Sequence, residues 1–141
     1  MNQDWAERIL RSYESLLPHM SDLTRAFYDR LFEVRPDTRA LFRIDMELQR
    51  QHLAALLAVI VRNLRMLDAI EDSLRELGAQ HARVGVRPEH YPVVRDAMLH
   101  AFARTVPQAW NSSLEADWRR LLEIISNQML AGALTKPPNA R

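Results

Sequence analysis

The chain has 141 residues, of which 48% are hydrophobic and 26% charged, and its formal net charge is +1. This length suits one domain with a sizeable core, so neither a disulfide nor a structural metal is needed to complete it. The absence of cysteine excludes disulfides, iron–sulfur clusters, cysteine zinc sites and covalently attached c-type haem. The three glycines form no phosphate-binding motif, and the 19 basic and 18 acidic residues nearly cancel, which argues against nucleotide chemistry and a nucleic-acid partner.

Apolar residues recur at helical spacing almost everywhere, and no stretch alternates for long enough to predict a strand. A first helix is expected over residues 5–17. Ser21 and Asp22 are expected to cap a second helix. A short helix is then expected from Pro36 to about Phe42.

The middle of the chain predicts the most apolar helix. Asp45 is expected to cap it. Arg50, Arg62 and Arg65 are expected to face water. The predicted inner face consists of Gln49, Leu53, Leu56, Ile60 and Leu64.

Three further helices are expected. Residues 67–77 belong to one, Pro88 is expected at the first position of the next, and Ser112 with Glu115 suggests a capping box for the last. We therefore expect a single all-α domain over residues 1–134 and a disordered C-terminal tail over residues 135–141. Unequal helices with frequent breaks favour steeply crossing helices over an up-and-down four-helix bundle.

Membrane and secretory segments are not expected. The longest unbroken apolar run, Leu53 to Val61, is much shorter than the ~18 residues that span a bilayer. The N-terminus lacks a basic segment followed by an apolar one. We therefore expect a cytoplasmic protein without a membrane span.

His81 is the histidine best placed to carry chemistry. It continues the apolar stripe of residues 67–77 at the same three-and-four spacing, so the inner face of that helix ends in an imidazole. Such a residue is commonly a core histidine bonded to a carbonyl. A neutral imidazole in an apolar pocket can also ligate an iron that a porphyrin already holds. Spacing alone leaves both interpretations open.

Two polar side chains lie on apolar faces of other predicted helices. Burying the amide of Gln49 without a partner would cost about 1–3 kcal/mol, so it either reaches water or finds an inner partner. Tyr28 stands among apolar residues, where it is either a core tyrosine or part of a pocket. With His81, these side chains can line one apolar cavity suited to a small polar ligand on a metal.

Three segments carry a family resemblance. They are Ala26-Phe-Tyr-Asp-Arg-Leu-Phe32, Arg39-Ala-Leu-Phe42 and Leu77-Gly-Ala-Gln-His-Ala-Arg-Val-Gly-Val-Arg-Pro-Glu-His-Tyr-Pro-Val-Val94. They resemble the bacterial single-domain globins and the haem domain of flavohaemoglobins, and the match covers almost the whole chain. The resemblance implies a globin fold of six to seven helices around a haem pocket.

The resemblance also implies roles for single residues. His81 matches the proximal iron ligand, Tyr28 the distal hydrogen-bond donor, and Phe42 the phenylalanine that packs against the porphyrin. The implied cofactor is haem b, iron protoporphyrin IX held without a covalent bond.

The distal position on the long helix has two candidates. Counting back from His81 places Gln49 there and Leu53 over the haem, whereas counting forward from Phe42 places His52 there. We prefer Gln49, because a deletion after Phe42 is easier in a connecting turn than inside packed helices. His52 then flanks the pocket mouth, where it turns toward the iron, pairs with a haem propionate or lies at a surface edge.

The proximal side matches the flavohaemoglobins only in part. Val86, with Phe42 and Leu53, is a candidate for the apolar wall. Tyr91 matches their proximal tyrosine, but Ala133 stands near the position of their glutamate. That carboxylate increases electron donation from the proximal imidazole, so its absence weakens the expectation of oxygen activation.

The resemblance supports three functions. The first is reversible binding of dioxygen or another diatomic gas, with Tyr28 and Gln49 as hydrogen-bonding partners. The second is a nitric oxide dioxygenase that works with a separate reductase, since no flavin or nicotinamide domain is expected. The third is a gas sensor that acts through a partner protein. We rank gas binding first, and the sequence leaves the oligomeric state open.

Overall fold

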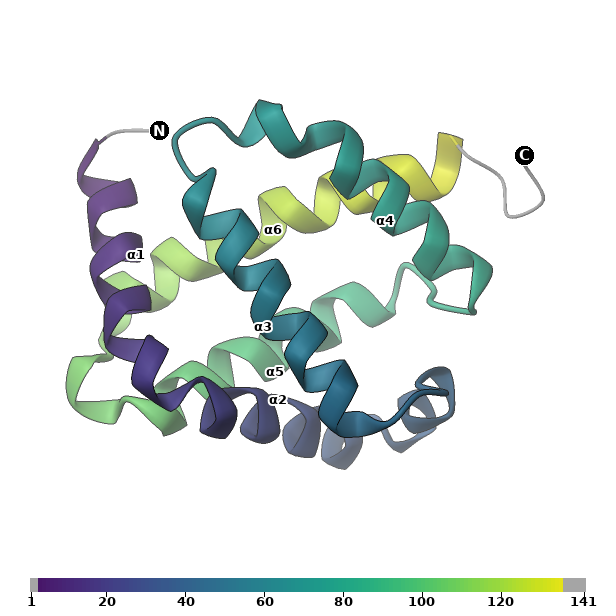
Figure 1. Cartoon of the computed structure of the whole chain (residues 1–141), viewed down its shortest axis with the longest axis horizontal. Helices are drawn as coiled ribbons and strands as arrows, with labels where there is room; N and C mark the ends of the chain where they lie inside the picture. Colours follow the sequence, from purple (N-terminus) through teal and green to yellow (C-terminus); the bar gives the residue numbers. More distant parts are fainter. Residues whose placement is uncertain (1–2, 136–141) are drawn as a thin grey trace.

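The computed structural model describes residues 3–135, and over this range six α-helices and four short 3-10 helices follow one another without a strand (Figure 1). The α-helices are α1 (Gln3–Leu16), α2 (Met20–Val34), α3 (Met46–Arg62), α4 (Glu71–Arg83), α5 (His90–Thr105) and α6 (Ser112–Thr135). The 3-10 helices are η1 (Leu17–His19), η2 (Pro36–Leu41), η3 (Leu67–Ile70) and η4 (Pro107–Ala109). The predicted all-α class is confirmed.

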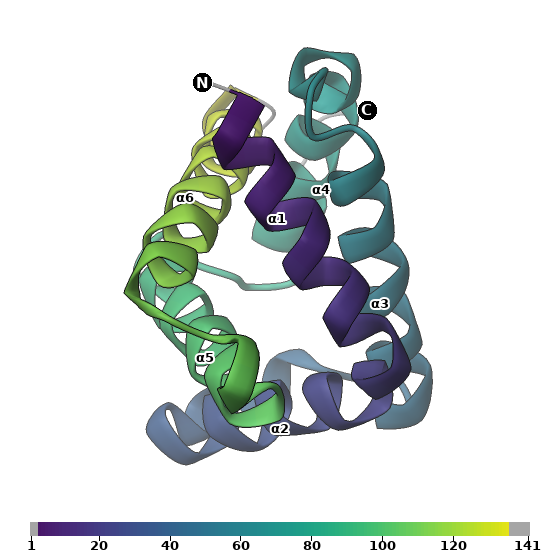
Figure 2. The ribbon, with the colours of Figure 1, turned by 90° about the vertical axis from the view of Figure 1, so that its left-hand side faces the viewer.

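The helices cross steeply rather than running in parallel. α4 packs mainly on α6, and α2 packs mainly on α5. α3 crosses the face of the molecule between these pairs, and α1 lies along one edge (Figures 1 and 2). This arrangement agrees with the expectation from the unequal predicted helices.

The core is made of large apolar side chains from most of the helices. The largest fully buried ones are Trp118, Phe102, Ile9, Leu16, Leu23, Leu31 and Leu121. The rings of Phe102 and Trp118 lie 4.5 Å apart, centroid to centroid. The indole Nε1 of Trp118 donates to Ser12 Oγ at 2.8 Å, which satisfies a polar atom that burial would otherwise penalise.

An ion pair that the sequence does not reveal joins α1 to α6. Arg8 Nε lies 2.6 Å from Asp117 Oδ2, and Arg8 Nη2 lies 2.9 Å from Asp117 Oδ1. The Asp117 side chain is only 7% exposed, so the fork-shaped guanidinium compensates a charge that has lost most of its water.

The long helix α3 follows the prediction at its cap and in part along its inner face, where Ile60 is buried but Leu53 and Leu56 are only half-buried and Leu57 and Val61 are buried as well. The Asp45 carboxylate accepts the N–H three residues further on at 3.2 Å, as expected of its N-cap. Arg62 and Arg65 are exposed, as predicted. Arg50 is less exposed than predicted, since its side chain is 21% exposed and pairs with the exposed Glu47. The aliphatic stem of an arginine can pack on apolar surface while its charged end finds a partner.

The start of α2 differs from the prediction. Ser21 and Asp22 lie inside the first turn, and no side chain caps the helix. The reason is that η1 runs directly into α2, where the N–H of Met20 already donates to the carbonyl of Leu17. The chain therefore enters α2 at His19 without a side-chain hydrogen bond to cap the helix.

The start of α5 also differs. Pro88 does not occupy the first position, because α5 begins at His90. The Arg87 N–H donates to His90 Nδ1 at 2.9 Å, and the His90 N–H donates to the Arg87 carbonyl at 2.9 Å. These bonds close a separate turn ahead of the helix. The carbonyl of Pro88 accepts the N–H of Tyr91 at 3.2 Å, so the proline shapes that turn.

The end of α6 lies one residue beyond the predicted domain boundary at residue 134. Thr135 belongs to the helix rather than to the predicted tail, and the rest of that tail, residues 136–141, lies outside the described residues. No helix in the described part of the chain is long and apolar enough to cross a membrane.

The cap of α6 is one residue earlier than the predicted capping box. Asn111 Oδ1 accepts the N–H of Leu114 at 2.9 Å, and the Asn111 carbonyl accepts the N–H of Glu115 at 3.0 Å. Since the first helical hydrogen bond already begins at Asn111, Ser112 lies inside the helix, and the predicted capping box is wrong by one position.

Asn111→Ala should therefore destabilise the protein, whereas Ser112→Ala should have little effect. The expected loss for Asn111→Ala is about 1 kcal/mol in the free energy of unfolding, because one N–H of the first turn loses its acceptor. Urea unfolding of both variants measures this difference. A larger loss for Ser112→Ala would contradict the assignment of the cap.

Candidate functional site

His81 lies in the last turn of α4, where its imidazole is half-buried. Its Nδ1 lies 2.9 Å from the carbonyl oxygen of Leu77. A carbonyl oxygen only accepts, so Nδ1 carries the proton and the lone pair of the neutral ring is on Nε2. Burial lowers the pKa of His81, and this effect outweighs the Leu77 carbonyl, which raises it. The ring is therefore mostly neutral at pH 7, with an Nε2 lone pair suited to a metal ion.

The turn after α4 holds the backbone of His81. The His81 carbonyl accepts the N–H of Val84 at 3.2 Å and that of Val86 at 2.9 Å. Gly85 makes this turn possible, because its φ of 106° lies in the left-handed region that favours glycine. A Cβ at Gly85 would lie 3.2 Å from Leu41 Cδ2. The turn after α4 therefore lies close to η2, the segment that leads to Phe42.

Tyr28 on α2 and Gln49 on α3 are brought together by the fold. The amide Nε2 of Gln49 donates to the hydroxyl oxygen of Tyr28 at 3.0 Å. Burial raises the pKa of Tyr28, while the hydrogen bond from Gln49 and the charge of Arg50 lower it less strongly. The phenol therefore stays protonated at neutral pH. Its oxygen accepts from Gln49, and its own proton remains to be donated.

Aromatic rings hold Tyr28 in place. Its ring packs edge-on against Phe42, with centroids 5.4 Å apart and planes at 83°. Phe27 lies 4.7 Å away and Phe32 5.9 Å away, and Phe32 also contacts Phe42 at 5.7 Å. Edge-to-face contacts of this kind are favourable beyond the area they bury. Phe42 therefore lies beside the hydroxyl-bearing ring, although the two residues come from different segments.

The remaining predicted wall residues are less buried. Leu53 and Val86 are half-buried and pack against the core. His52 is exposed on α3. Of the two candidates for the distal position, Gln49 rather than His52 is hydrogen-bonded to Tyr28.

Tyr91 carries a buried polar atom that the described residues do not satisfy. It lies in the first turn of α5, is 9% exposed, and its hydroxyl has no hydrogen-bond partner among them. Burial raises its pKa. A buried hydroxyl without a partner is destabilising, and a bound cofactor or its water can supply the missing partner. The orphaned hydroxyl therefore fits a protein that holds a further group.

Gly78 packs against α6 at a position that apolar spacing does not single out. This residue lies on α4, three positions before His81, and a Cβ there would lie 1.8 Å from the backbone oxygen of Met129 on α6. The available signal was a glycine inside a predicted helix, where it is unfavourable unless close packing requires it.

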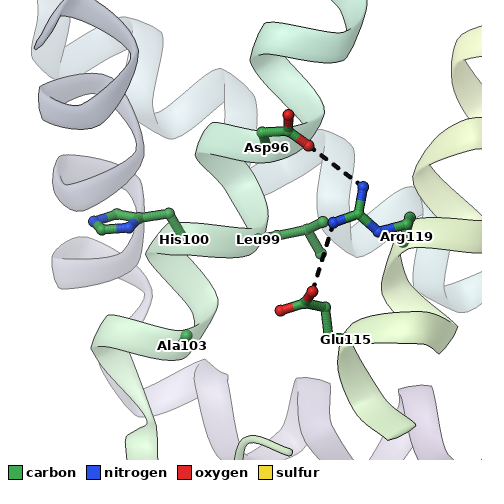
Figure 3. A pocket seen from close by; sticks show the side chains of 6 residues that line it. All are labelled: Asp96, Leu99, His100, Ala103, Glu115 and Arg119. Carbon is green, nitrogen blue, oxygen red and sulfur yellow. Dashed lines mark hydrogen bonds and ion pairs between the residues drawn. The ribbon is translucent and has the colours of Figure 1, made fainter. Parts of the chain in front are cut away.

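A polar hollow of about 380 Å³ lies between α5 and α6 (Figure 3). It is lined by Asp96, Leu99, His100, Ala103, Glu115 and Arg119. Arg119 lies 3.5 Å from a carboxylate oxygen of Asp96 and 3.5 Å from one of Glu115, and His100 points away from Arg119 (Figure 3). None of the predicted site residues lines this hollow, and its charged groups pair with one another. It is not the candidate site.

Comparison with known protein families identifies the chain. The globin family model matches residues 25–129, which is well over half of the sequence. The chain therefore belongs to the globin family, and the predicted family resemblance is confirmed. Membership in this family implies haem binding and diatomic gas ligands.

Similar proteins of known sequence include one from a plant and one from a bacterium. The anaerobic nitrite reductase NSHB5 of Oryza sativa subsp. indica is 29% identical over 118 residues, which cover 79% of this chain and 81% of that protein. The flavohemoprotein of Bacillus subtilis (strain 168) is 26% identical over 118 residues, covering 82% of this chain but 30% of that protein. The similarity to the flavohemoprotein therefore involves only part of its length.

Solved structures show the same fold. An engineered carbene transferase from Rhodothermus marinus superposes with a TM-score of 0.85 at 24% identity, covering 96% of this chain and 94% of the other. A bacterial globin from Campylobacter jejuni has a TM-score of 0.76 at 20% identity, covering 92% and 96%. At these identities the likeness shows the fold alone. The predicted globin fold is confirmed.

Tyr91→Phe should leave the haem-free protein as stable as the wild type or make it more stable at neutral pH, because the hydroxyl that is removed bonds to nothing among the described residues. Burial raises the pKa of folded Tyr91 above the ordinary value for tyrosine, which is about 10. The raised pKa therefore contributes to the stability of the folded wild type below pH 10, where the phenol is protonated. This contribution is lost as the pH rises through the folded pKa. The variant should accordingly lose less stability than the wild type above pH 10.

Urea unfolding at neutral pH and above pH 10 measures both effects. Tyr28→Phe is the matched control, since it deprives the Gln49 amide of its acceptor and should cost about 1 kcal/mol at neutral pH. A Tyr91→Phe variant that is less stable than Tyr28→Phe would show that the Tyr91 hydroxyl has a partner.

Proposed function

We propose that the protein holds haem b without a covalent bond and reversibly binds dioxygen or another diatomic gas. His81 Nε2 would ligate the haem iron, and Tyr28 and Gln49 would interact with the bound gas. The hydrogen bond between Gln49 and Tyr28 carries the proposal, because two polar groups from different helices meet on otherwise apolar faces.

The haem supplies reversible coordination of a gas at ferrous iron, and the residues of the chain supply its setting. The Leu77 carbonyl orients the imidazole of His81 and selects the tautomer with its lone pair on Nε2. Burial keeps that ring neutral, which is the form that coordinates a metal.

On the distal side, the phenol of Tyr28 donates its proton to a polar ligand. Gln49 supports this donation, because its amide N–H donates to the phenol oxygen and so limits rotation of the hydroxyl. The hydrogen bond from Tyr28 to the ligand is stronger than it would be in water, since the surroundings have a low dielectric constant. Phe42 restricts the ring of Tyr28 from the side, and with Leu53 and Val86 it keeps water away.

The proximal side favours binding over oxygen activation. The partner of His81 Nδ1 is a neutral carbonyl rather than a carboxylate, so the imidazole gains little anionic character. Ala133, near the position of the flavohaemoglobin glutamate, offers no carboxylate. We therefore rank reversible gas binding above turnover.

A nitric oxide dioxygenase supported by a separate reductase is the second candidate. It is favoured by the similarity to a flavohemoprotein and by the distal phenol, which suits polar ligands. Nitric oxide consumption under air, with and without an added reductase, separates the two functions. Sustained consumption that requires the reductase supports the enzyme.

Tyr28→Phe should speed dissociation of dioxygen from the ferrous protein. The expected increase is roughly 10- to 100-fold, because a hydrogen bond from a buried hydroxyl to a polarised ligand contributes about 1.5–3 kcal/mol. Stopped-flow displacement of dioxygen measures the rate. Tyr13→Phe, a half-buried tyrosine on α1, is the matched control and should leave the rate unchanged. Equal rates in wild type and Tyr28→Phe would remove Tyr28 from the distal site.

A further inference from the structure

The helix that bears His81 touches α6 backbone to backbone. A Cβ at Gly78 would lie 1.8 Å from the carbonyl oxygen of Met129 and 2.6 Å from its Cα. A Cβ at Gly132 on α6 would lie 1.9 Å from the carbonyl oxygen of Arg75 on α4. Each helix therefore supplies one glycine against the backbone of the other, and neither position has room for any side chain.

Side chains keep the two helices from sliding along this crossing. Arg75 Nε donates to Gln128 Oε1 on α6 at 3.2 Å, and the same guanidinium lies 3.0 Å from Glu71 on its own helix. Leu74 and Met129, from the two helices, are both buried. The glycines thus set how close α4 and α6 come, and the polar and apolar side chains around them set the register.

The position of the imidazole follows from this crossing. His81 lies three residues, about one helical turn, after Gly78. Its Nδ1 is bonded to the carbonyl of Leu77, the residue next to Gly78. Movement of α4 away from α6 at Gly78 would therefore move the Leu77 carbonyl and the ring that it holds.

We propose that Gly78 and Gly132 are positioning residues that hold α4 at one distance from α6 and so present His81 Nε2 at one depth to the iron. This inference rests on the proposed role of His81 as the proximal ligand. Glycine inside a helix is unfavourable relative to alanine, and the backbone contact explains why it is present at both positions.

Gly78→Ala provides the direct test. The new Cβ meets backbone atoms, so the helices must separate by about 1 Å or more before it fits a densely packed interior. Removing the neighbouring side chain in Gly78→Ala/Met129→Ala should not restore the wild-type behaviour, because the collision is with the Met129 carbonyl. Gly132→Ala acts at the other contact, one turn further from His81.

Two measurements report on the position of α4. In the haem-free protein, Gly78→Ala should accelerate amide hydrogen exchange in α4 by about tenfold or more relative to the other helices. In the ferrous haem-loaded protein, the iron–histidine stretching band in resonance Raman spectra should be displaced. Leu23→Ala is the matched control, since it removes a buried side chain from α2, which packs mainly on α5. It should accelerate exchange without displacing the band.

The proposal is overturned if Gly78→Ala leaves α4 exchange and the iron–histidine band unchanged, if Leu23→Ala displaces the band equally, or if the Met129→Ala change restores both. Should Gly78→Ala fail to fold, the same measurements on Gly132→Ala decide. The exchange experiment needs no haem, so failure of the wild type to bind haem would refute the proposed function and leave the test of the helix crossing intact.

Discussion

The hydrogen bond from His81 Nδ1 to the Leu77 carbonyl is the interaction on which the proposed site depends. It lies within one helix, so α4 itself determines which ring nitrogen carries the proton. Burial then keeps the ring neutral. The two interpretations of His81, as a core histidine and as a metal ligand, are therefore compatible. A histidine that donates to a carbonyl through Nδ1 still offers its other nitrogen to a metal.

The placement of α4 links this local bond to the rest of the molecule. The glycine contacts at Gly78 and Gly132 bring α4 directly onto α6. The Arg8–Asp117 pair and the hydrogen bond from Trp118 to Ser12 tie α6 in turn to α1. The proposed distal groups, Tyr28 and Gln49, come from α2 and α3, which precede α4 in the chain. Aromatic rings and the Gln49 amide hold Tyr28 in place. Two independently supported sets of side chains therefore make up the proposed site.

Much of this arrangement follows from the sequence. Apolar spacing and proline breaks predict the helices, and the isolated polar residues on apolar faces single out Tyr28, Gln49 and His81. The count that preferred Gln49 to His52 agrees with the bond to Tyr28. The predicted cap at Asp45 is present, whereas the capping box of α6 was wrong by one position, because several neighbouring polar residues suit a cap and only backbone geometry selects Asn111. Contacts between distant residues, such as Gly78 with Met129, have no periodic signal and need the fold to reveal them.

The most direct test of the account is a haem titration of the wild type and His81→Gly, with and without free imidazole. We expect the wild type to bind one haem with an intense Soret band and the variant to lose this spectrum and most of its affinity. Imidazole should restore the spectrum by entering the space left by the side chain. A His81→Gly variant that keeps the wild-type spectrum and affinity without imidazole would contradict the assignment of His81 as the iron ligand.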